Sequence, residues 1–233
     1  MKLNSQSPEP IVGAGSTVVV HSIFQTIQGE GPFAGVPAVF VRLAGCNLQC
    51  PLCDTEYTSR RTPLSPAIIL AYIVESIYPQ PPLVVITGGE PLRQPIGPLC
   101  ELLLRNGYTV QVETNGTLYR ADMPYEHPNF YVVCSPKTHM VNRDLLPYIK
   151  AFKYVATAGS LDPVDGLPTQ ALEHPRKRNL FRAPKNHPAQ IFLQPVDEQD
   201  EVKNAQNVHA VVRACIQHNH RLCLQIHKLT GLE

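Results

Sequence analysis

The chain has 233 residues, of which 43% are hydrophobic, and its formal net charge is +1. This length can bury a core as one domain, and the hydrophobic fraction excludes a chain that is disordered throughout. A duplex-binding protein needs a surplus of basic side chains, so the balanced charge predicts a small-molecule partner and no nucleic acid. No run of about eighteen apolar residues occurs, so we expect no membrane span and no membrane partner.

The first sixteen residues contain one lysine and are rich in Ser, Pro and Gly, without the apolar stretch of a signal peptide. We therefore expect a flexible N-terminal leader over residues 1–16, a single domain over residues 17–233 and a cytoplasmic location. Disulfides are rare in that compartment, and the odd number of seven cysteines agrees with this. Three of them lie within eight residues, a grouping typical of metal or redox chemistry.

Short apolar runs rich in β-branched residues predict strands at 17–24, 38–44, 83–87, 108–113, 130–134, 151–155, 190–193 and 221–226. A helix is predicted at 66–78 because Ser65 is a suitable N-cap before Pro66, and a second at 96–106 because Gly107 can close it. The helical spacing of apolar residues predicts a third helix at 198–218. Repeated strand-then-helix order indicates an α/β layer or barrel. A proline-rich basic segment at about 157–188 interrupts this order, and we expect a long loop or insertion there.

Polar motifs follow six of the predicted strands. The carboxyl ends of parallel strands share one face, and ligands bind at that face in both barrels and open sheets. The motifs should therefore converge on one site. They occupy residues 46–53, 88–91, 113–116, 135–137, 194–197 and 227–228.

The cysteines at positions 46, 50 and 53 are separated by three and then two residues. A structural zinc site usually takes four protein ligands, and no second cysteine pair lies nearby. Three thiolates can hold three irons of a cubane cluster and leave the fourth iron open to a small molecule. The spacing therefore favours an iron–sulfur cluster, with a zinc-stabilised binding protein as the alternative from another class. We expect the other four cysteines to lie in the core.

At this spacing the sequence resembles the radical S-adenosylmethionine superfamily. There the open iron chelates the methionine portion of the cofactor, and an electron from the cluster cleaves the sulfonium to a 5′-deoxyadenosyl radical. Gly88-Gly89-Glu90-Pro91 resembles the glycine-rich element of that superfamily. Glycines allow the backbone to approach a ligand closely, and a carboxylate such as Glu90 can pair with its ammonium group.

Motifs across most of the chain resemble one family of that superfamily, 7-carboxy-7-deazaguanine synthase. The matching segments are 24–31, 35–42, 53–55, 135–137, 193–196 and 225–228. The resemblance implies ring contraction of 6-carboxy-5,6,7,8-tetrahydropterin to 7-carboxy-7-deazaguanine with loss of ammonia, on the route to queuosine and related deazapurines. It also implies one 4Fe-4S cluster, Mg²⁺, a flavodoxin- or ferredoxin-type electron donor, a homodimer, and an incomplete, modified (β/α)6 barrel.

The resemblance carries roles onto matching positions, beginning with Cys46, Cys50 and Cys53 for the cluster and the hydroxyl of Thr55 for Mg²⁺. Arg42 also follows from chemistry, because a guanidinium at the end of an apolar strand should face a carboxylate. The expected substrate residues are Ile27, Gln28, Gly29, Glu30, Arg42, Thr87 and His227, with His227 at the end of the last strand. The expected S-adenosylmethionine residues are Leu52, Cys53, Asp54, Gly89, Ser135, Pro136, Lys137, Gln194, Pro195, Val196 and Asp197.

Two regions depart from the family pattern. Segment 157–188 matches nothing in it, and the ending 229–233 differs, which leaves open a substrate contact by the terminal carboxylate. Within the superfamily, a glycyl-radical-enzyme activating protein is the alternative, because such proteins are also short and have a similar cysteine spacing. That alternative gives no reason for Gln28, Arg42 and His227 to converge on a cavity.

Overall fold

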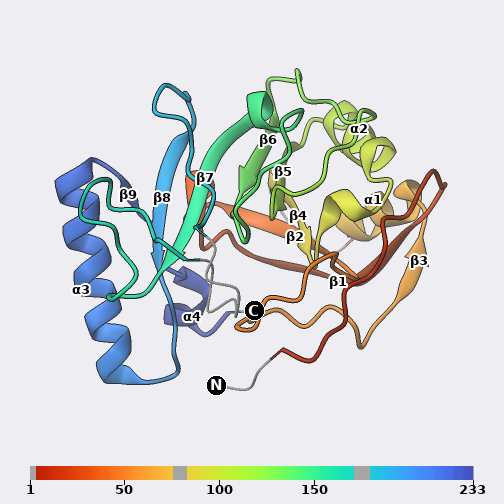
Figure 1. The fold of residues 1–233 in the computed structure, drawn as a ribbon. Helices are drawn as coiled ribbons and strands as arrows, with labels where there is room; N and C mark the ends of the chain where they lie inside the picture. Colours follow the sequence, from red (N-terminus) through yellow and green to blue (C-terminus); the bar gives the residue numbers. More distant parts are fainter. Residues whose placement is uncertain (1–3, 76–82, 171–178, 233) are drawn as a thin grey trace.

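A computed structural model describes residues 4–75, 83–170 and 179–232. One mixed sheet forms the centre of the molecule, with strands in the order β3-β1-β2-β4-β5-β6-β7-β8-β9 (Figure 1). From β2 to β9 all neighbouring strands are parallel, whereas β1 is antiparallel to both β2 and β3. The strands are β1 (Val18–Ile27), β2 (Pro37–Leu43), β3 (Thr62–Leu64), β4 (Leu83–Gly88), β5 (Thr109–Thr114), β6 (Phe130–Cys134), β7 (Ile149–Ala156), β8 (Gln190–Pro195) and β9 (Arg221–Leu222).

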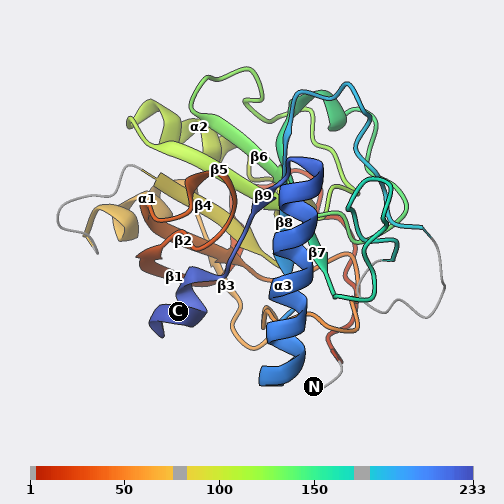
Figure 2. The ribbon, with the colours of Figure 1, turned by 90° about the vertical axis from the view of Figure 1, so that its left-hand side faces the viewer.

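The sheet does not close, because β3 and β9 lie at opposite edges of the strand order. The α-helices of the described residues are α1 (Pro66–Glu75), α2 (Gly97–Arg105), α3 (Glu201–His218) and α4 (Ile226–Thr230). Helix α3 packs along β8 and faces the viewer in Figure 2, while Figure 1 shows α1 and α2 together at the opposite side of the molecule. The expected α/β fold, an incomplete and modified (β/α)6 barrel, is confirmed.

Local sequence explains where the longer helices begin and end. The Ser65 hydroxyl accepts a hydrogen bond from the Ile68 amide at the start of α1. The Asp200 carboxylate accepts from the amides of Val202 and Lys203 and caps α3, which ends at Asn219 in the left-handed conformation. These caps confirm the starts predicted for both helices to within three residues. Residues 76–78 of the first predicted helix lie outside the described residues.

Successive side chains of a strand point to opposite sides of the sheet. One side is covered by the main core, and the other side carries two smaller apolar clusters and becomes polar at the carboxyl ends of the strands. Strand residues such as Val41, Ile86 and Val112 are fully buried in the main core cluster. Their alternate neighbours Arg42, Thr87 and Glu113 instead line a cavity, as do Lys153 and Gln194 further along the sheet. The polar face at the carboxyl ends of the strands is therefore where the candidate site lies.

The last strand differs from its prediction. Only Arg221 and Leu222 pair with β8, and the chain then turns into α4, so residues 223–226 are not strand. The pairing stops at Leu193 and Leu222, although β8 itself continues to Pro195. His227 therefore lies in a short helix and not at a strand end. The small edge strand β3 was not predicted.

We call residues 46–55, which contain the three clustered cysteines, the cysteine loop, and residues 4–12 the N-terminal strap. The strap runs along the cysteine loop. The Asn4 side chain donates to the Cys50 carbonyl at 3.0 Å, and the Glu9 amide donates to the Cys46 carbonyl at 2.7 Å. The Gln6 amide group donates to the Thr55 carbonyl at 2.9 Å. The strap therefore contacts the backbone of the loop at both ends and near its centre.

In the described part of segment 157–188, between β7 and β8, the backbone forms turns and two isolated β-bridges, Leu161–Pro168 and Gln170–Asn179. Arg182 forms ion pairs with Asp162 and Asp165 across this segment. The predicted long loop thus stands where the barrel pattern would place another helix.

Candidate active site

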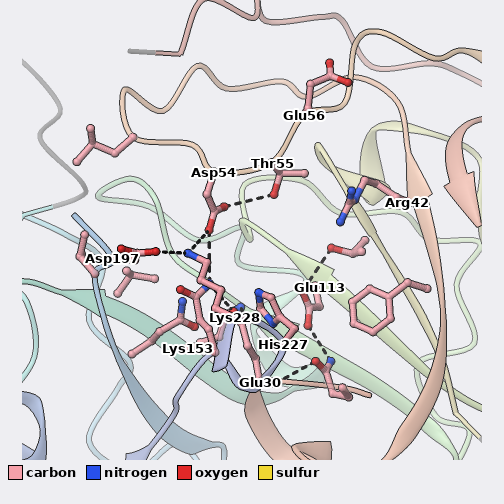
Figure 3. A pocket seen from close by; sticks show the side chains of 18 of the residues that line it. Glu30, Arg42, Asp54, Thr55, Glu56, Glu113, Lys153, Asp197, His227 and Lys228 are labelled. Atoms are coloured by element: carbon pink, nitrogen blue, oxygen red, sulfur yellow. Dashed lines mark hydrogen bonds and ion pairs between the residues drawn. The ribbon is translucent and has the colours of Figure 1, made fainter. Parts of the chain in front are cut away.

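Two adjoining cavities lie at the carboxyl ends of the strands, with volumes of about 480 Å³ and about 160 Å³. The larger is lined by the polar face of the sheet, the 28–30 loop and α4, and Figure 3 shows their side chains pointing into it. The smaller is lined by the three clustered cysteines and the glycine-rich turn. Both cavities share the side chains of Leu52, Asp54, Thr55, Thr87, Glu113, Lys137 and Lys153. Groups bound in the two cavities would therefore meet at this shared wall.

The cysteine loop follows β2, and its thiols line the smaller cavity. Burial raises the pKa of Cys46 to about 12 and also raises the pKa values of Cys50 and Cys53. Bound metal would offset this cost, because coordination to a cation stabilises the thiolate. Within the described residues no three His, Cys, Asp or Glu side chains stand at metal-ligand spacing. The Cys53 thiol points to the Thr55 carbonyl at 3.6 Å, so cluster assembly must break that contact.

The glycine-rich turn packs closely against the protein's own backbone beside the cysteine loop. Gly88 has a φ of +126°, a Cβ there would collide with the Leu43 backbone, and a Cβ at Gly89 would collide with the Gly45 carbonyl oxygen. Both glycines line the cavity that holds the cysteines. A cradle without side chains beside three thiols fits a cluster that carries a small-molecule ligand.

Glu90 does not point into either cavity. Its carboxylate accepts hydrogen bonds from the amides of Leu92 and Asn115, at 3.0 and 2.7 Å, and from the Thr114 hydroxyl at 2.7 Å. Burial raises the pKa of Glu90 to about 7 in spite of these bonds. Glu90 thus ties β4 to the turn after β5, and the expectation that it pairs with a ligand ammonium is wrong in this structure.

The 28–30 loop connects β1 to the sheet face through Glu113. Nε2 of the Gln28 side chain donates to the Glu113 carboxylate at 3.0 Å, and the backbone amide of Glu30 donates to Oε1 of the same Gln28 side chain at 3.0 Å. Thr87 also donates to Glu113, at 3.3 Å. Gln28, Glu30, Thr87 and Glu113 all line the larger cavity. Glu113 is thus the common acceptor that organises this wall, a role that the sequence did not define.

Arg42 lies at the far side of the larger cavity, and its guanidinium is 5.0 Å from the centre of the Phe24 ring. Thr87 is its neighbour in the β2–β4 pairing. The predicted meeting of a guanidinium with the cavity is therefore present. A cation–π contact with Phe24 thus helps to hold a guanidinium side chain in the wall of the cavity.

His227 lies over the 28–30 loop because α4 places it there, and not because it ends a strand as predicted. A Cβ at Gly29 would lie 2.6 Å from Nδ1 of His227, so only glycine permits this approach. The Ile226 amide donates to the Gly29 carbonyl at 3.4 Å. His227 lines the larger cavity, whereas Ile27 and Gly29 are not among its lining residues.

The residues expected to hold S-adenosylmethionine surround the junction of the two cavities. Leu52, Asp54, Ser135, Lys137, Gln194, Val196 and Asp197 line one or both of them, together with Cys53 and Gly89 in the smaller. Lys137 donates to the Ser135 hydroxyl at 3.0 Å. Pro136 and Pro195 lie between lining residues and are not themselves part of the described walls.

The sequence reasoning did not identify Lys153 as a site residue, and it placed Lys228 in a converging motif without giving it a role. Lys153 is buried on β7 and lies against Glu30, and Lys228 pairs with Asp197 at 3.0 Å and with Asp54 at 3.8 Å (Figure 3). The signal for Lys153 was present, since a lysine stands inside the apolar run 151–155. A charge there is expensive unless a partner compensates it, which predicts a functional or ion-paired group.

Comparison with known proteins identifies the class. The model of the radical SAM superfamily matches residues 41–128, a stretch that includes the cysteine loop and the glycine-rich turn. A crystal structure of QueE from Escherichia coli superposes with a TM-score of 0.67 and 27% identity, covering 90% of this chain and 94% of that chain. The chain is a radical S-adenosylmethionine enzyme, and such enzymes use a 4Fe-4S cluster with that cofactor.

Two curated relatives narrow the class to a family. The 7-carboxy-7-deazaguanine synthase of Rhodospirillum rubrum is 43% identical, over 97% of this chain and 96% of the relative. The synthase of the same name from Rickettsia prowazekii is 38% identical, over 95% of this chain and 91% of the relative. The chain belongs to the 7-carboxy-7-deazaguanine synthase family. In its described residues, no helix has both the length and the apolar character that crossing a membrane requires.

Proposed function

We propose that this chain contracts the ring of 6-carboxy-5,6,7,8-tetrahydropterin to 7-carboxy-7-deazaguanine and releases ammonia, as a carbon–nitrogen lyase of deazapurine biosynthesis. The observation that carries the proposal is the shared wall between a polar cavity and the cavity of the cysteine loop. One cavity offers groups for a small anionic heterocycle, and the other offers three thiols for a cluster.

The larger cavity presents a cation and an anion at separate positions. Arg42 can form charge-assisted hydrogen bonds with the substrate carboxylate. The carboxylate of Glu30 and the amide of Gln28 can pair with the pterin edge, which carries N–H donors and a carbonyl acceptor. Both groups line the cavity. Their combined effect would be to fix the ring in one orientation.

When bound, the cluster and S-adenosylmethionine supply a 5′-deoxyadenosyl radical. The chain must then keep the substrate hydrogen beside the carboxylate within contact distance of the 5′ carbon. Thr87 and Glu113 line both cavities, at the place where the two ligands would meet. Arg42 and the 28–30 loop would hold the substrate against this wall.

Mg²⁺ would be held by the hydroxyl of Thr55, which lines both cavities and donates to Asp54 at 3.4 Å. Substrate oxygens and water would complete the six oxygen ligands that Mg²⁺ prefers. S-adenosylmethionine would lie along the 135–137 and 194–197 motifs, beside the loop at 52–54. Lys137 and Asp197 offer opposite charges for its carboxylate and ammonium groups.

We also propose a flavodoxin- or ferredoxin-type electron donor, a homodimer and a cytoplasmic location. Residues 17–233 would form one radical SAM domain, with residues 157–188 as an insertion. The glycyl-radical-enzyme activating protein and the zinc-stabilised binding protein have lost their support, because the chain belongs to the synthase family.

The test is an anaerobic incubation of the reconstituted protein with dithionite, S-adenosylmethionine, Mg²⁺ and the tetrahydropterin, followed by mass spectrometry. We expect 7-carboxy-7-deazaguanine in excess of the S-adenosylmethionine consumed, since the family uses that cofactor catalytically. Cleavage of S-adenosylmethionine without any deazaguanine would keep the superfamily chemistry and refute the proposed reaction.

A further inference from the structure

Lys153 and Glu30 form a buried ion pair in the wall of the larger cavity. Lys153 lies within β7, and Glu30 immediately precedes the short helix η1 (Gly31–Phe33). Their side chains are only 10% and 11% exposed. Figure 3 shows both pointing into the same region of the cavity. Two charges removed from water in this way need a structural or functional reason.

Both oxygens of the Glu30 carboxylate have protein partners. One accepts the ammonium of Lys153, and the other accepts the side-chain amide of Gln225 at 2.9 Å. Each carboxylate oxygen has two lone pairs, so each retains one for a ligand. The carboxylate plane is thus fixed from two sides while the cavity side can still accept hydrogen bonds.

The electrostatic balance at Glu30 depends on Lys153. Burial alone would raise the pKa of Glu30, but the charge and hydrogen bond of Lys153, helped by Gln225, hold that pKa below its ordinary value. In turn, the negative charge of Glu30 raises the pKa of Lys153 above its ordinary value, although burial opposes this. The pair is therefore fully charged near neutral pH.

We propose that Lys153 is a positioning residue that fixes the Glu30 carboxylate as the acceptor for the N–H edge of the pterin. This inference rests on the proposed function, because the N–H edge belongs to the proposed substrate. A tetrahydropterin presents the ring N3–H and the 2-amino group side by side. A carboxylate held in one plane can accept both, whereas a carboxylic acid loses one acceptor and gains a competing donor.

The surroundings of the pair contain further charged or titratable groups, which any pH dependence must take into account. Asp54 acts to raise the pKa of Glu30, and Glu113 and Cys223 act on Lys153. The Gly31 amide donates to the Cys223 sulfur at 3.3 Å, next to Glu30. The groups on the cysteine loop, β5, the 223 turn and α4 are Asp54, Glu113, Cys223, His227 and Lys228.

Removing the lysine charge should make substrate binding depend on pH. In Lys153→Met the desolvation of Glu30 is no longer opposed by a cation, so the pKa of Glu30 rises. The carboxyl group is then partly protonated at lower pH and becomes charged again as pH increases. We expect the KM for the tetrahydropterin, divided by that of wild type, to be raised roughly tenfold to a hundredfold at the acidic end. This ratio should fall as pH rises.

The measurement is KM for the tetrahydropterin across the neutral pH range, and division by the wild-type value removes the ionisation of the substrate itself. Glu30→Gln cannot titrate, so its ratio should be raised but flat, and Lys153→Arg should stay near wild type. Lys153→Gln is a second uncharged variant in case Lys153→Met fails to fold. Iron content should match wild type in all of them, because neither Lys153 nor Glu30 belongs to the three clustered thiols.

A flat KM ratio in both uncharged variants would overturn the inference, because a merely structural ion pair changes stability without a pH-dependent affinity. An active wild-type enzyme with that flat ratio would leave the proposed reaction intact. A wild-type enzyme that makes no deazaguanine would instead refute the proposed function, and this inference with it.

Discussion

The thiols of Cys46, Cys50 and Cys53 differ from the other four cysteines in their surroundings. Cys100, Cys134 and Cys215 belong to the main hydrophobic core cluster, and Cys223 belongs to a smaller one. Only the trio shares a cavity with a glycine turn among the described residues. A buried thiol among apolar side chains packs as a small apolar group, whereas a thiol at a cavity wall can reach a metal.

Cys50→Ala should abolish cluster assembly and S-adenosylmethionine cleavage, because two thiolates cannot hold three irons of a cubane. Cys100→Ala is the matched control, with normal iron content and a stability loss of about 0.5–3 kcal/mol from the small core cavity. Iron and sulfide analysis with visible absorption measures the first effect, and thermal unfolding measures the second. Full 5′-deoxyadenosine production by Cys50→Ala would refute the cluster assignment.

Arg42→Ala should raise the KM for the tetrahydropterin by roughly tenfold to more than a hundredfold, since a hydrogen bond between charged groups contributes about 1.5–3 kcal/mol. The KM for S-adenosylmethionine should change little, because Arg42 is not among the residues expected to hold that cofactor. Arg42→Lys keeps the charge but not the bidentate geometry and should be intermediate. Equal losses for both substrates would argue against a carboxylate site at Arg42.

Thr55→Ala should weaken the Mg²⁺ activation of turnover while leaving the visible spectrum of the cluster unchanged. The variant removes one oxygen from an ion that requires near-octahedral coordination. Thr55→Ser keeps a hydroxyl and should retain most of the response. A Mg²⁺ titration of turnover for the three proteins is the measurement, and an unchanged curve for Thr55→Ala would place the ion elsewhere.

At the scale of elements, the N-terminal strap is held mainly by Glu9. Its carboxylate pairs with Arg61 at 2.7 Å and with the buried Arg93 at 3.2 Å, and Arg93 also donates to the Pro10 carbonyl at 2.8 Å. The hydrogen bond from Arg61, together with the charge of Arg93, lowers the pKa of Glu9 in spite of burial. The ion pairs of Glu9 therefore help to hold the strap against the cysteine loop.

Glu9→Gln should weaken the ion pairs that hold the strap and should therefore accelerate the loss of iron from the cluster-loaded protein to a chelator. Because the folded-state pKa of Glu9 is depressed, its stabilisation is fully present above the ordinary carboxyl pKa and is lost as pH falls through the folded value. The difference between variant and wild type should therefore shrink in acid. Gln6→Ala is a second strap variant that removes a bond to the Thr55 carbonyl without changing charge. Identical release rates in all three proteins would show that the strap does not support the loop.

The elements that the sequence predicted well are those whose pattern is local. Apolar β-branched runs and capping residues are sufficient to place β4, β6 and the ends of α3 within a few residues. The alternation on the polar face was harder to see, because single polar residues such as Lys153 interrupt otherwise apolar runs. The ending at 221–226 has a strand composition, but the chain leaves β8 after Leu222 and enters α4 at Ile226, although β8 continues to Pro195. The composition of the segment does not show this turn.

The residues of the candidate site likewise fall into those that the sequence predicts and those that only the fold reveals. The clustered thiols, Arg42 and the 28–30 loop were found because motif spacing and strand ends are readable in one dimension. The Lys153–Glu30 pair joins residues 123 positions apart, and the Lys228–Asp54 pair links α4 to the cysteine loop. Such contacts depend on how the open sheet curves, so they follow only from the fold.

At the scale of the whole molecule, the open sheet brings two cavities together at the carboxyl ends of its strands. Strands β2 to β8 present their carboxyl ends around two cavities that share a wall, and α4 and the cysteine loop cover this end. A radical formed in the smaller cavity would face the substrate in the larger without passing through solvent. The account therefore requires direct hydrogen transfer between the two bound molecules.

The most direct test is an anaerobic incubation with tetrahydropterin deuterated at the carbon that bears the carboxylate. Mass spectrometry of 5′-deoxyadenosine and of recovered S-adenosylmethionine measures whether the label has moved. We predict deuterium in both, together with formation of 7-carboxy-7-deazaguanine that carries no label, because the carboxylate-bearing carbon has no hydrogen in the product. Transfer should be lost in Arg42→Ala at a substrate concentration that saturates wild type. Deazaguanine formed while 5′-deoxyadenosine stays unlabelled would contradict the central claim that the two cavities bring the radical and this hydrogen together.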